Sequence, residues 1–383
     1  MSEIDYASIS PYTDQQAVEA LHKVARNPML PVISKFLFPD EPFYSLHKML
    51  KSINSIDEFQ EVVMSKMVVA DIQRSSSGFT YEGIEHLDTG KTFLAVSNHR
   101  DIILDPALIQ WTLFHNKMPL TEICVGSNLL EGNKIVADLL RSNRMIKVIR
   151  GISARELYLS SKLLSSYIRS RVASGEASVW VAQREGRTKN GIDLTEQGLL
   201  KMFDMSGTKG FKENFMELNI TPMSISYEYE SCDMKKAREL YLSKDRKYVK
   251  KRTEDLHSIM TGIKQWKGRI HLNIDTPLTE EEIERASICD KNDRYQYIRH
   301  VLDYRIVKLY KLWKTNYMGY DLMNRTTKYS SLYGKDDLEA FKAYTEHKLS
   351  KVERNLDRDA LRQLFWEIYG NPVARKEELC PID

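Results

Sequence analysis

One short turn of the sequence brings a histidine and two aspartates together. It runs Ser97-Asn98-His99-Arg100-Asp101-Ile102-Ile103-Leu104-Asp105-Pro106. An apolar run typical of a strand precedes it (92–96), and one typical of a helix follows it (107–114). A histidine at the end of a strand, oriented by a carboxylate, can remove a proton from a hydroxyl group. Taken alone, the same residues equally fit helix caps formed by Asn98 with His99 and by Asp105.

The sequence has no Gly-x-Ser-x-Gly elbow. We therefore expect the histidine to activate a hydroxyl of the substrate itself, without a covalent enzyme intermediate.

A second polar loop directly follows the very apolar segment 177–182. It reads Gln183-Arg184-Glu185-Gly186-Arg187-Thr188-Lys189-Asn190-Gly191. The glycines let the backbone approach an anion, and Arg187 and Lys189 supply positive charge. Because α/β sheets bind ligands at the carboxyl ends of their strands, we expect a ligand-binding loop more than a solvated basic turn.

Two further positions follow or interrupt apolar strands. Arg150 stands after the segment 145–149 and either grips a phosphate or has a structural role. Pro222 lies in the segment 219–227, which lines an apolar channel or packs in the core. A proline in such a segment indicates an edge strand or the start of a strand.

The surrounding pattern predicts the scaffold for these loops. Strand-like runs alternate with helical ones, which favours an α/β fold with a mostly parallel sheet flanked by helices. We expect an N-terminal helical lobe at 1–79, an α/β domain at 80–277 with a basic helical insertion at about 233–265, and a C-terminal helical region at 278–383. The predicted strands are 92–96, 122–126, 145–149, 177–182, 219–227 and 268–275, and the predicted helices of the domain include 106–114, 133–140 and 154–174.

Composition limits the classes of protein that fit. The 383 residues are 42% hydrophobic and 28% charged, as in a folded soluble protein, and the net charge of +3 does not by itself indicate nucleic-acid binding. No stretch approaches the roughly 20 apolar residues of a membrane span. The acidic, polar N-terminus is unlike a secretory leader. The four cysteines have neither metal-site nor redox-pair spacing, which favours a cytoplasmic protein without a metal.

Two segments bear on a membrane surface. The segment 233–252 has nine basic and three acidic residues, which suits an anionic bilayer, the phosphates of CoA or, equally, a solvated helical hairpin. The segment 294–317 combines an apolar stripe with basic residues, as an interfacial helix does. Packing on the catalytic domain is slightly favoured, because the stripe is mostly aliphatic. Its members are Ile298, Val301, Leu302, Leu309, Leu312 and Trp313.

In this order, the four motifs resemble those of the glycerolipid acyltransferase family, which includes lysophosphatidic acid and glycerol-3-phosphate acyltransferases. That family has Asn-His-x-x-x-x-Asp, an arginine after a short strand, a Glu-Gly-Thr-Arg type of loop, and a proline-bearing strand. The corresponding residues here are Asn98-His99 with Asp105, then Arg150, Glu185-Gly186-Arg187 and Pro222. The resemblance covers about 80–277, and the flanking lobes resemble a bacterial subgroup with an Asn-His-Arg-Asp run.

The sequence departs from the family pattern at two places. Five residues separate His99 from Asp105 where the family has four, so Asp105 requires a bulge in the turn and Asp101 is the alternative partner. The apolar helix after Leu104-Asp105 favours Asp105. In the loop, Arg187 follows Glu-Gly one place early, and Thr188-Lys189-Asn190-Gly191 replaces the usual continuation.

The resemblance implies a reaction and a set of roles. His99, oriented by Asp105, removes the proton of a glycerol hydroxyl, which attacks the thioester of acyl-CoA or of acyl-carrier protein. Arg187, with Arg150 and Lys189, holds the phosphate of lysophosphatidic acid or glycerol-3-phosphate, and an N–H near Gly186 stabilises the oxyanion. The remaining substrate-binding positions are Asn98, Glu185, Thr188 and Pro222.

We therefore expect a phospholipid-synthesis enzyme without a cofactor beyond its thioester, held peripherally on the inner face of the cytoplasmic membrane. One alternative is an acyltransferase for an amino-acid lysolipid without phosphate. Another is an inactive lipid-binding scaffold. Nucleic acid is not expected as a partner, because neither a stacking platform nor a recognition helix is evident.

Overall fold

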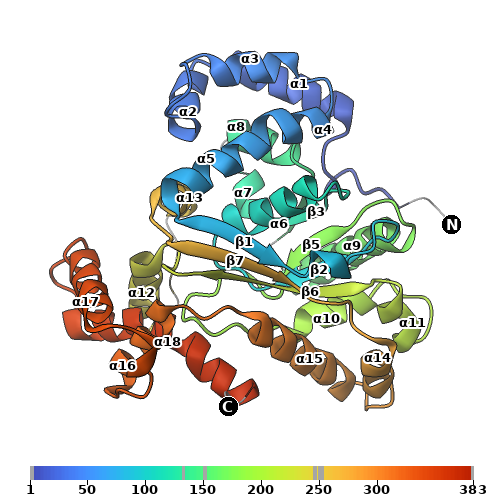
Figure 1. The fold of residues 1–383 in the computed structure, drawn as a ribbon. Coiled ribbons are helices and arrows are strands. Elements are labelled where there is room, and N and C mark those ends of the chain that lie inside the picture. Colours follow the sequence, from blue (N-terminus) through green and yellow to red (C-terminus); the bar gives the residue numbers. More distant parts are fainter. Residues whose placement is uncertain (1–3, 132–133, 150–152, 245–247, 249–253, 381–383) are drawn as a thin grey trace.

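The computed structural model describes residues 4–131, 134–149, 153–244, 248 and 254–380. Its centre is a seven-stranded sheet in the order β1-β7-β6-β2-β5-β3-β4 (Figure 1). All neighbouring strands are parallel except β6 and β7. This confirms the predicted α/β class and mostly parallel sheet. The strands are β1 (Gly78–Glu82), β2 (Leu94–Ser97), β3 (Glu122–Gly126), β4 (Met145–Val148), β5 (Val179–Ala182), β6 (Ile220–Tyr227) and β7 (Arg269–Ile274).

Side chains alternate between the two faces of the sheet and divide the core in two. Leu94 and Val96 of β2 pack with α9 (Ala154–Ala173), α10 (Gln197–Asp204) and other helices on one face. Ala95 packs on the other face with α6 (Leu104–His115). Burial of both faces explains why the central strands read as continuous apolar runs. The edge strand β1 was not predicted, because its short Phe-Thr-Tyr alternation is only partly buried.

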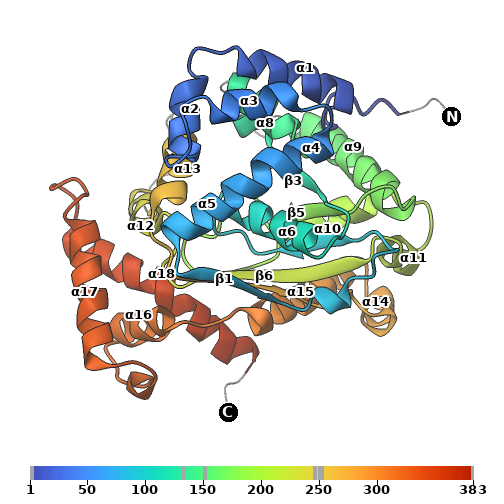
Figure 2. The same cartoon turned by 45° about the horizontal axis from the view of Figure 1, so that its top comes forward.

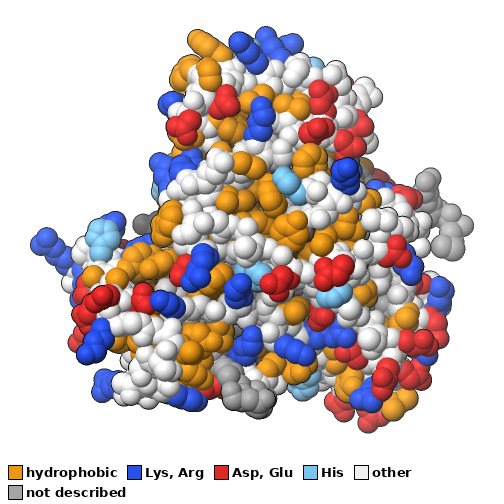
Figure 3. Space-filling view, in the orientation of Figure 1, with side chains coloured by type: hydrophobic (Ala, Val, Ile, Leu, Met, Phe, Trp, Pro, Cys, Tyr) orange, Lys and Arg blue, Asp and Glu red, His pale blue; other side chains and the backbone are white. Residues whose placement is uncertain are grey.

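The N-terminal helices form a layer above the sheet, with a hydrophobic core of their own (Figures 1 and 2). A π-helical turn at Gln60–Met64 leads into the last of them. Between this layer and the sheet, hydrophobic side chains gather on the face shown in Figure 3. The helices of the layer are α1 (Asp14–Ala25), α2 (Leu30–Leu37), α3 (Ser45–Ser52), α4 (Ile56–Phe59) and α5 (Ser65–Ser75).

The C-terminal segment divides between two cores. Ile298 and Leu302 of α15 (Asp293–Leu309) are buried in the same cluster as β2, so this helix packs on the domain and its stripe is not an interfacial surface. A second cluster joins α18 (Arg358–Leu379) to α12 (Asp233–Leu242) of the predicted insertion. The other helices of these regions are α13 (Glu254–Lys264), α14 (Glu280–Ser287), α16 (Lys314–Asn324) and α17 (Lys335–Leu349).

The remaining helices connect strands on the faces of the sheet. Within the described ranges, no helix is both long and apolar enough to cross a membrane. The short connecting helices are α7 (Ser127–Leu130), α8 (Lys134–Arg141), α11 (Phe211–Met216) and a 3-10 turn at Ile84–His86. A second 3-10 turn, Ser330–Leu332, lies between α16 and α17, beyond the last strand.

Register brings the two polar loops together. Ser97, the last residue of β2, lies opposite Ala182 of β5 and Met223 of β6. Because the three strands are parallel, the turn after β2 and the loop after β5 leave the sheet at the same edge.

Candidate active site

The turn after β2 wraps around the carboxylate of Asp105. His99 Nδ1 lies 2.8 Å from Asp105 Oδ2. The backbone N–H groups of Arg100 and Asp101 donate to the same oxygen at 2.5 and 2.9 Å. The extra residue between histidine and aspartate is thus accommodated by coiling the backbone around the carboxylate, and Asp105 is the aspartate that contacts His99.

Tyr227, the last residue of β6, completes the surroundings of Asp105. Its hydroxyl donates to Asp105 Oδ1 at 2.6 Å. Burial and the nearby Asp105 carboxylate hold the pKa of Tyr227 well above its usual range, so the phenol remains a donor. With donors on both oxygens, the carboxylate acts as an acceptor toward the imidazole. The His99 proton is therefore assigned to Nδ1, and Nε2 keeps the lone pair that a general base needs.

Asp101 has a different task, and the alternative in which it pairs with His99 is wrong. Its Oδ1 accepts the N–H groups of Ile103 and Leu104 at 2.9 and 2.8 Å, at the start of α6. Its Oδ2 accepts the Ser231 hydroxyl. Although burial acts to raise it, the pKa of Asp101 is lowered, because Lys267 and these hydrogen bonds stabilise the charge. Asp101 is a buried helix cap.

Asn98 is fully buried, and the expectation that it binds substrate needs correction. Its Nδ2 donates to Ile225 O at 3.0 Å, and its Oδ1 accepts from Ile225 N at 2.8 Å. The side-chain amide thus pairs with β6 as a backbone amide would, and it fixes the direction in which the turn leaves the sheet.

The loop after β5 runs beside the histidine. Gln183 N donates to Ser97 O at 2.8 Å, and Thr188 N donates to His99 O at 2.7 Å. Gly186 adopts a φ of 71°, which favours glycine, and nothing lies within 4 Å of the position that a Cβ would take. Its backbone is therefore accessible. Thr188 is buried, with its hydroxyl bonded to Asp193 at 2.6 Å, so it positions the loop rather than contacting a ligand.

The basic residues of the loop differ in their surroundings. Nη1 of Arg187 is buried and has no hydrogen-bond partner among the described residues. Lys189 forms an ion pair with Glu239 of α12, and its role as a phosphate ligand stays a prediction. Glu185 is exposed, and its backbone N–H donates to Glu196. Arg150, the other predicted phosphate ligand, lies outside the described residues.

Pro222 occupies an interior strand, so the expectation of an edge strand is wrong. It pairs with Val96 of β2, and its carbonyl accepts from Asp275 N at 2.9 Å. The ladder between β6 and β7 begins only at Met223. The side of Pro222 that lacks an N–H therefore faces the end of β7, where no ladder donor is required. Pro222 is buried in the sheet and does not line the turn.

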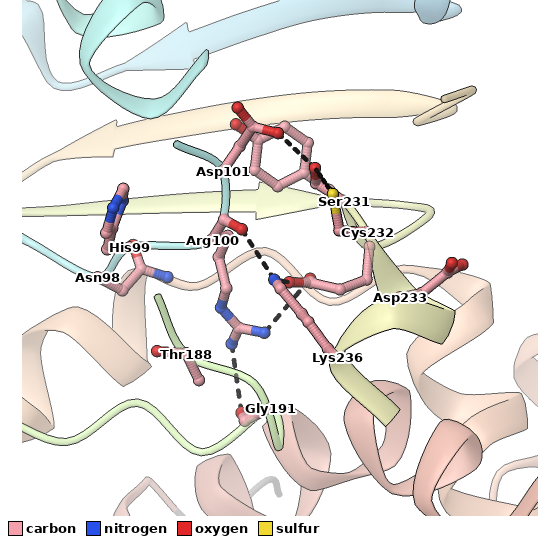
Figure 4. A network of polar contacts seen from close by, with 12 residues as sticks. Asn98, His99, Arg100, Asp101, Thr188, Gly191, Ser231, Cys232, Asp233 and Lys236 are labelled. Carbon is pink, nitrogen blue, oxygen red and sulfur yellow. Dashed lines mark hydrogen bonds and ion pairs between the residues drawn. The ribbon is translucent and has the colours of Figure 1, made fainter. Parts of the chain in front are cut away.

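A buried network of charges supports the turn from below (Figure 4). Arg100 is 1% exposed, and its Nη2 donates to Asp193 Oδ2 at 2.6 Å and to Gly191 O at 3.2 Å. Its Nη1 lies 3.4 Å from Glu230 Oε2. Lys236 donates to Arg100 O at 2.8 Å and also pairs with Glu230. The network joins the turn, the loop after β5 and the insertion.

Sequence reasoning missed most of this network. Lys236 counted only as one charge of a basic insertion, and Asp193, Tyr227 and Glu230 carried no motif. The one available signal was that Glu230 and Lys236 stand in the segment that follows a fully buried strand. Nothing in that pattern predicts which buried charge each would meet.

An apolar cavity of about 350 Å³ lies next to the turn. Ile102 and Ile103 line it from the turn, and Pro106 and Ala107 line it from the first turn of α6. Further side chains come from α2, α5, α8 and α13. The cavity therefore lies between the N-terminal layer and the domain, and it borders the turn that carries His99. Among the described residues, no cluster of histidine, cysteine, aspartate or glutamate is placed to hold a metal ion.

Comparison with known proteins addresses the family. No curated protein sequence matches the chain. A solved structure, the 1-acyl-sn-glycerophosphate (LPA) acyltransferase PlsC from Thermotoga maritima, is similar at 12% identity and a TM-score of 0.41, covering 79% of this chain and 98% of that chain. Residues 78–228 match the family model described as Acyltransferase. That segment holds the turn, the loop after β5 and Tyr227, while the narrower bacterial subgroup stays a prediction. Residues 78–228 are thus similar to the family that the motifs of the chain resemble.

Proposed function

We propose that the protein transfers a fatty acyl group from an acyl thioester to a hydroxyl of lysophosphatidic acid or glycerol-3-phosphate. The observation that carries the proposal is the His99–Asp105 pair. It stands beside a basic loop on one side and an apolar cavity on the other. A base, an anion site and space for an acyl chain are the three requirements of this reaction.

The proposed reaction uses one histidine as base and then as acid. His99 Nε2 accepts the proton of the acceptor hydroxyl while its oxygen attacks the thioester carbonyl carbon. A backbone N–H near Gly186 stabilises the oxyanion. The carbon–sulfur bond then breaks, and the imidazolium returns the proton to the departing thiolate. Asp105 keeps the ring oriented and stabilises its positive charge during the transfer.

The first test is an acyl-transfer assay with purified protein across a panel of acceptors, read by mass spectrometry. The panel includes glycerol-3-phosphate, lysophosphatidic acid and an amino-acid lysolipid. Transfer to the phosphate-bearing acceptors supports the proposal. Preference for the amino-acid lysolipid supports the alternative acceptor, and absence of thioester turnover with every acceptor supports a lipid-binding scaffold.

Arg187→Ala is expected to raise KM for a phosphate-bearing acceptor by about 10-fold to 100-fold, with a smaller effect on kcat. The reason is that an unpartnered, partly buried guanidinium N–H gains a charge-assisted hydrogen bond, worth about 1.5–3 kcal/mol, only when the phosphate is bound. Initial rates at varied acceptor concentration measure the change. Arg285→Ala, at an exposed position of α14, is the matched control. An unchanged KM would point to an acceptor without phosphate.

Ala107→Leu is expected to shift the preferred donor toward shorter acyl chains. Ala107 lines the apolar cavity, so the larger side chain reduces the volume that is left for a long acyl chain. Each methylene that no longer fits loses about 0.8 kcal/mol of burial, or roughly fourfold in kcat/KM. A chain-length series of donors measures the shift. Ala343→Leu, exposed on α17, is the control, and an identical chain-length profile in both variants would mean that the chain binds elsewhere.

For location, we propose peripheral association with the inner face of the cytoplasmic membrane. Supporting this, Val32 both lines the cavity and is 58% exposed, and its neighbour Met29 on the same side of the layer is 54% exposed. Apolar side chains at the mouth of a lipid cavity favour contact with a bilayer. Sedimentation with phospholipid vesicles tests the association, and protein that stays in the supernatant would contradict it.

A further inference from the structure

A second, larger hollow lies between the insertion and the C-terminal helices. Its volume is about 1080 Å³, and it is lined by α12, α13, α17 and the segment that follows α17. We refer to it as the basic groove. Met260, Trp266 and Val352 give it an apolar middle, and the first two of these side chains are exposed.

Most of the charged side chains that line the groove are basic. Six lysines and arginines line the basic groove against two carboxylates, Asp233 and Glu353. Both carboxylates are already paired within the groove, with Lys348 and Arg238 respectively. The other four basic side chains are exposed, and they come from three different elements. They are Lys235, Lys264, Lys351 and Arg354.

The basic groove is continuous with the candidate active site along α12. Lys235 lines the groove. Its pKa is lowered, first by burial and also by the nearby positive charge of Arg187. One helical turn further, Glu239 pairs with Lys189 of the loop after β5. On the opposite wall, Met260 of α13 lines both the groove and the apolar cavity. A ligand in the groove therefore borders both the anion site and the acyl site.

We propose that the basic groove docks a small acidic carrier protein that delivers the acyl thioester. This inference rests on the proposed function and identifies the donor for the same site. A concave surface that combines an exposed tryptophan and methionine with mainly basic side chains is typical of a protein-binding surface for an acidic partner. A flat bilayer would not fill a concave groove. The nucleotide of CoA would need its phosphate ligands gathered at one point, whereas these four cations come from three different elements.

The test compares two donors that carry the same acyl chain, palmitoyl-acyl-carrier protein and palmitoyl-CoA. The variant Lys351→Glu with Arg354→Glu reverses two exposed rim charges outside the candidate active site. We expect the KM of this variant for the carrier donor to be about 10-fold or more above that of the wild type. Its kcat/KM with that donor should depend less on salt concentration than the wild-type value does. Its KM for palmitoyl-CoA should be unchanged. The control is Lys91→Glu with Arg285→Glu, both exposed and away from the groove.

Fluorescence anisotropy of a labelled palmitoyl-carrier protein measures docking without turnover. Binding by wild-type protein that the groove variant loses supports the proposal even if no acyl transfer occurs, in which case the proposed function alone has failed. Absence of carrier binding by the wild type overturns the proposal, as does equal binding by both proteins. An equal rise in KM for both donors would also overturn the proposal and would indicate that the groove binds CoA. Loss of vesicle sedimentation with unchanged carrier binding would overturn it as well and would indicate that the groove contacts a membrane.

Discussion

Replacing His99 with alanine is expected to lower kcat for acyl transfer by about 100-fold to 10,000-fold, the range that a general base contributes. Nε2 of the imidazole faces away from Asp105 and keeps a free lone pair that can accept a proton. Alanine has no group that could accept it. Initial rates with saturating donor and acceptor measure the loss. Since the His99 side chain is 15% exposed and the polar contact of its ring among the described residues is with Asp105, the variant should fold normally, which thermal unfolding checks.

The control for this substitution is His300→Ala, which removes an exposed histidine from α15. It should retain full activity. If His99→Ala also retained it, the base would have to be another group, and the His99–Asp105 pair would be a structural element of the turn.

Arg100→Met is expected to lower the free energy of unfolding by about 3–5 kcal/mol, the cost of leaving a buried charge without its partner. Arg100 is the cation that meets Asp193 directly and also contacts Glu230. Methionine has similar volume but, among the described residues, leaves Asp193 with the Asn98 amide and the Thr188 hydroxyl as its hydrogen-bond partners. Chemical denaturation of the two proteins measures the difference.

Two further variants separate charge from shape. Arg285→Met, at an exposed position, should change the free energy of unfolding by less than about 0.5 kcal/mol. Combining Arg100→Met with Asp193→Asn removes both charges and should cost less than the sum of the single variants. Additive effects, or a loss no larger than that of Arg285→Met, would show that the buried pair does not stabilise the turn.

The parts of the fold that rest on local pattern were predictable. The apolar runs gave six of the seven strands, and their alternation with helices implied that the two polar loops would share one edge of the sheet. Asp105 was favoured over Asp101 from its place before an apolar helix, and the geometry agrees. The sequence could not show how a turn with an extra residue closes, because the two backbone N–H groups that hold Asp105 have no side-chain signature.

Long-range polar partners were not predictable for a different reason. Arg100 meets Asp193 and Glu230, which are 93 and 130 residues away, and no periodicity links such positions. Asn98 and Thr188 were expected to face a ligand because they stand in motifs with chemistry. Both side chains are buried and hold the loops in place. A motif contains residues that position a loop as well as residues that contact the substrate, and the sequence does not distinguish the two.

The buried network has a consequence for how this domain can be divided. The family match ends at residue 228. Glu230, which pairs with Arg100, and Ser231, which donates to Asp101, lie just beyond this end. Lys236, which donates to the carbonyl oxygen of Arg100, follows in α12. Ending the chain at that boundary would take these partners from two buried charges of the histidine turn, Arg100 and Asp101, and would remove β7 from the sheet. The segment that matches the family model is thus shorter than the segment that holds the histidine turn in place, and the insertion belongs to the second.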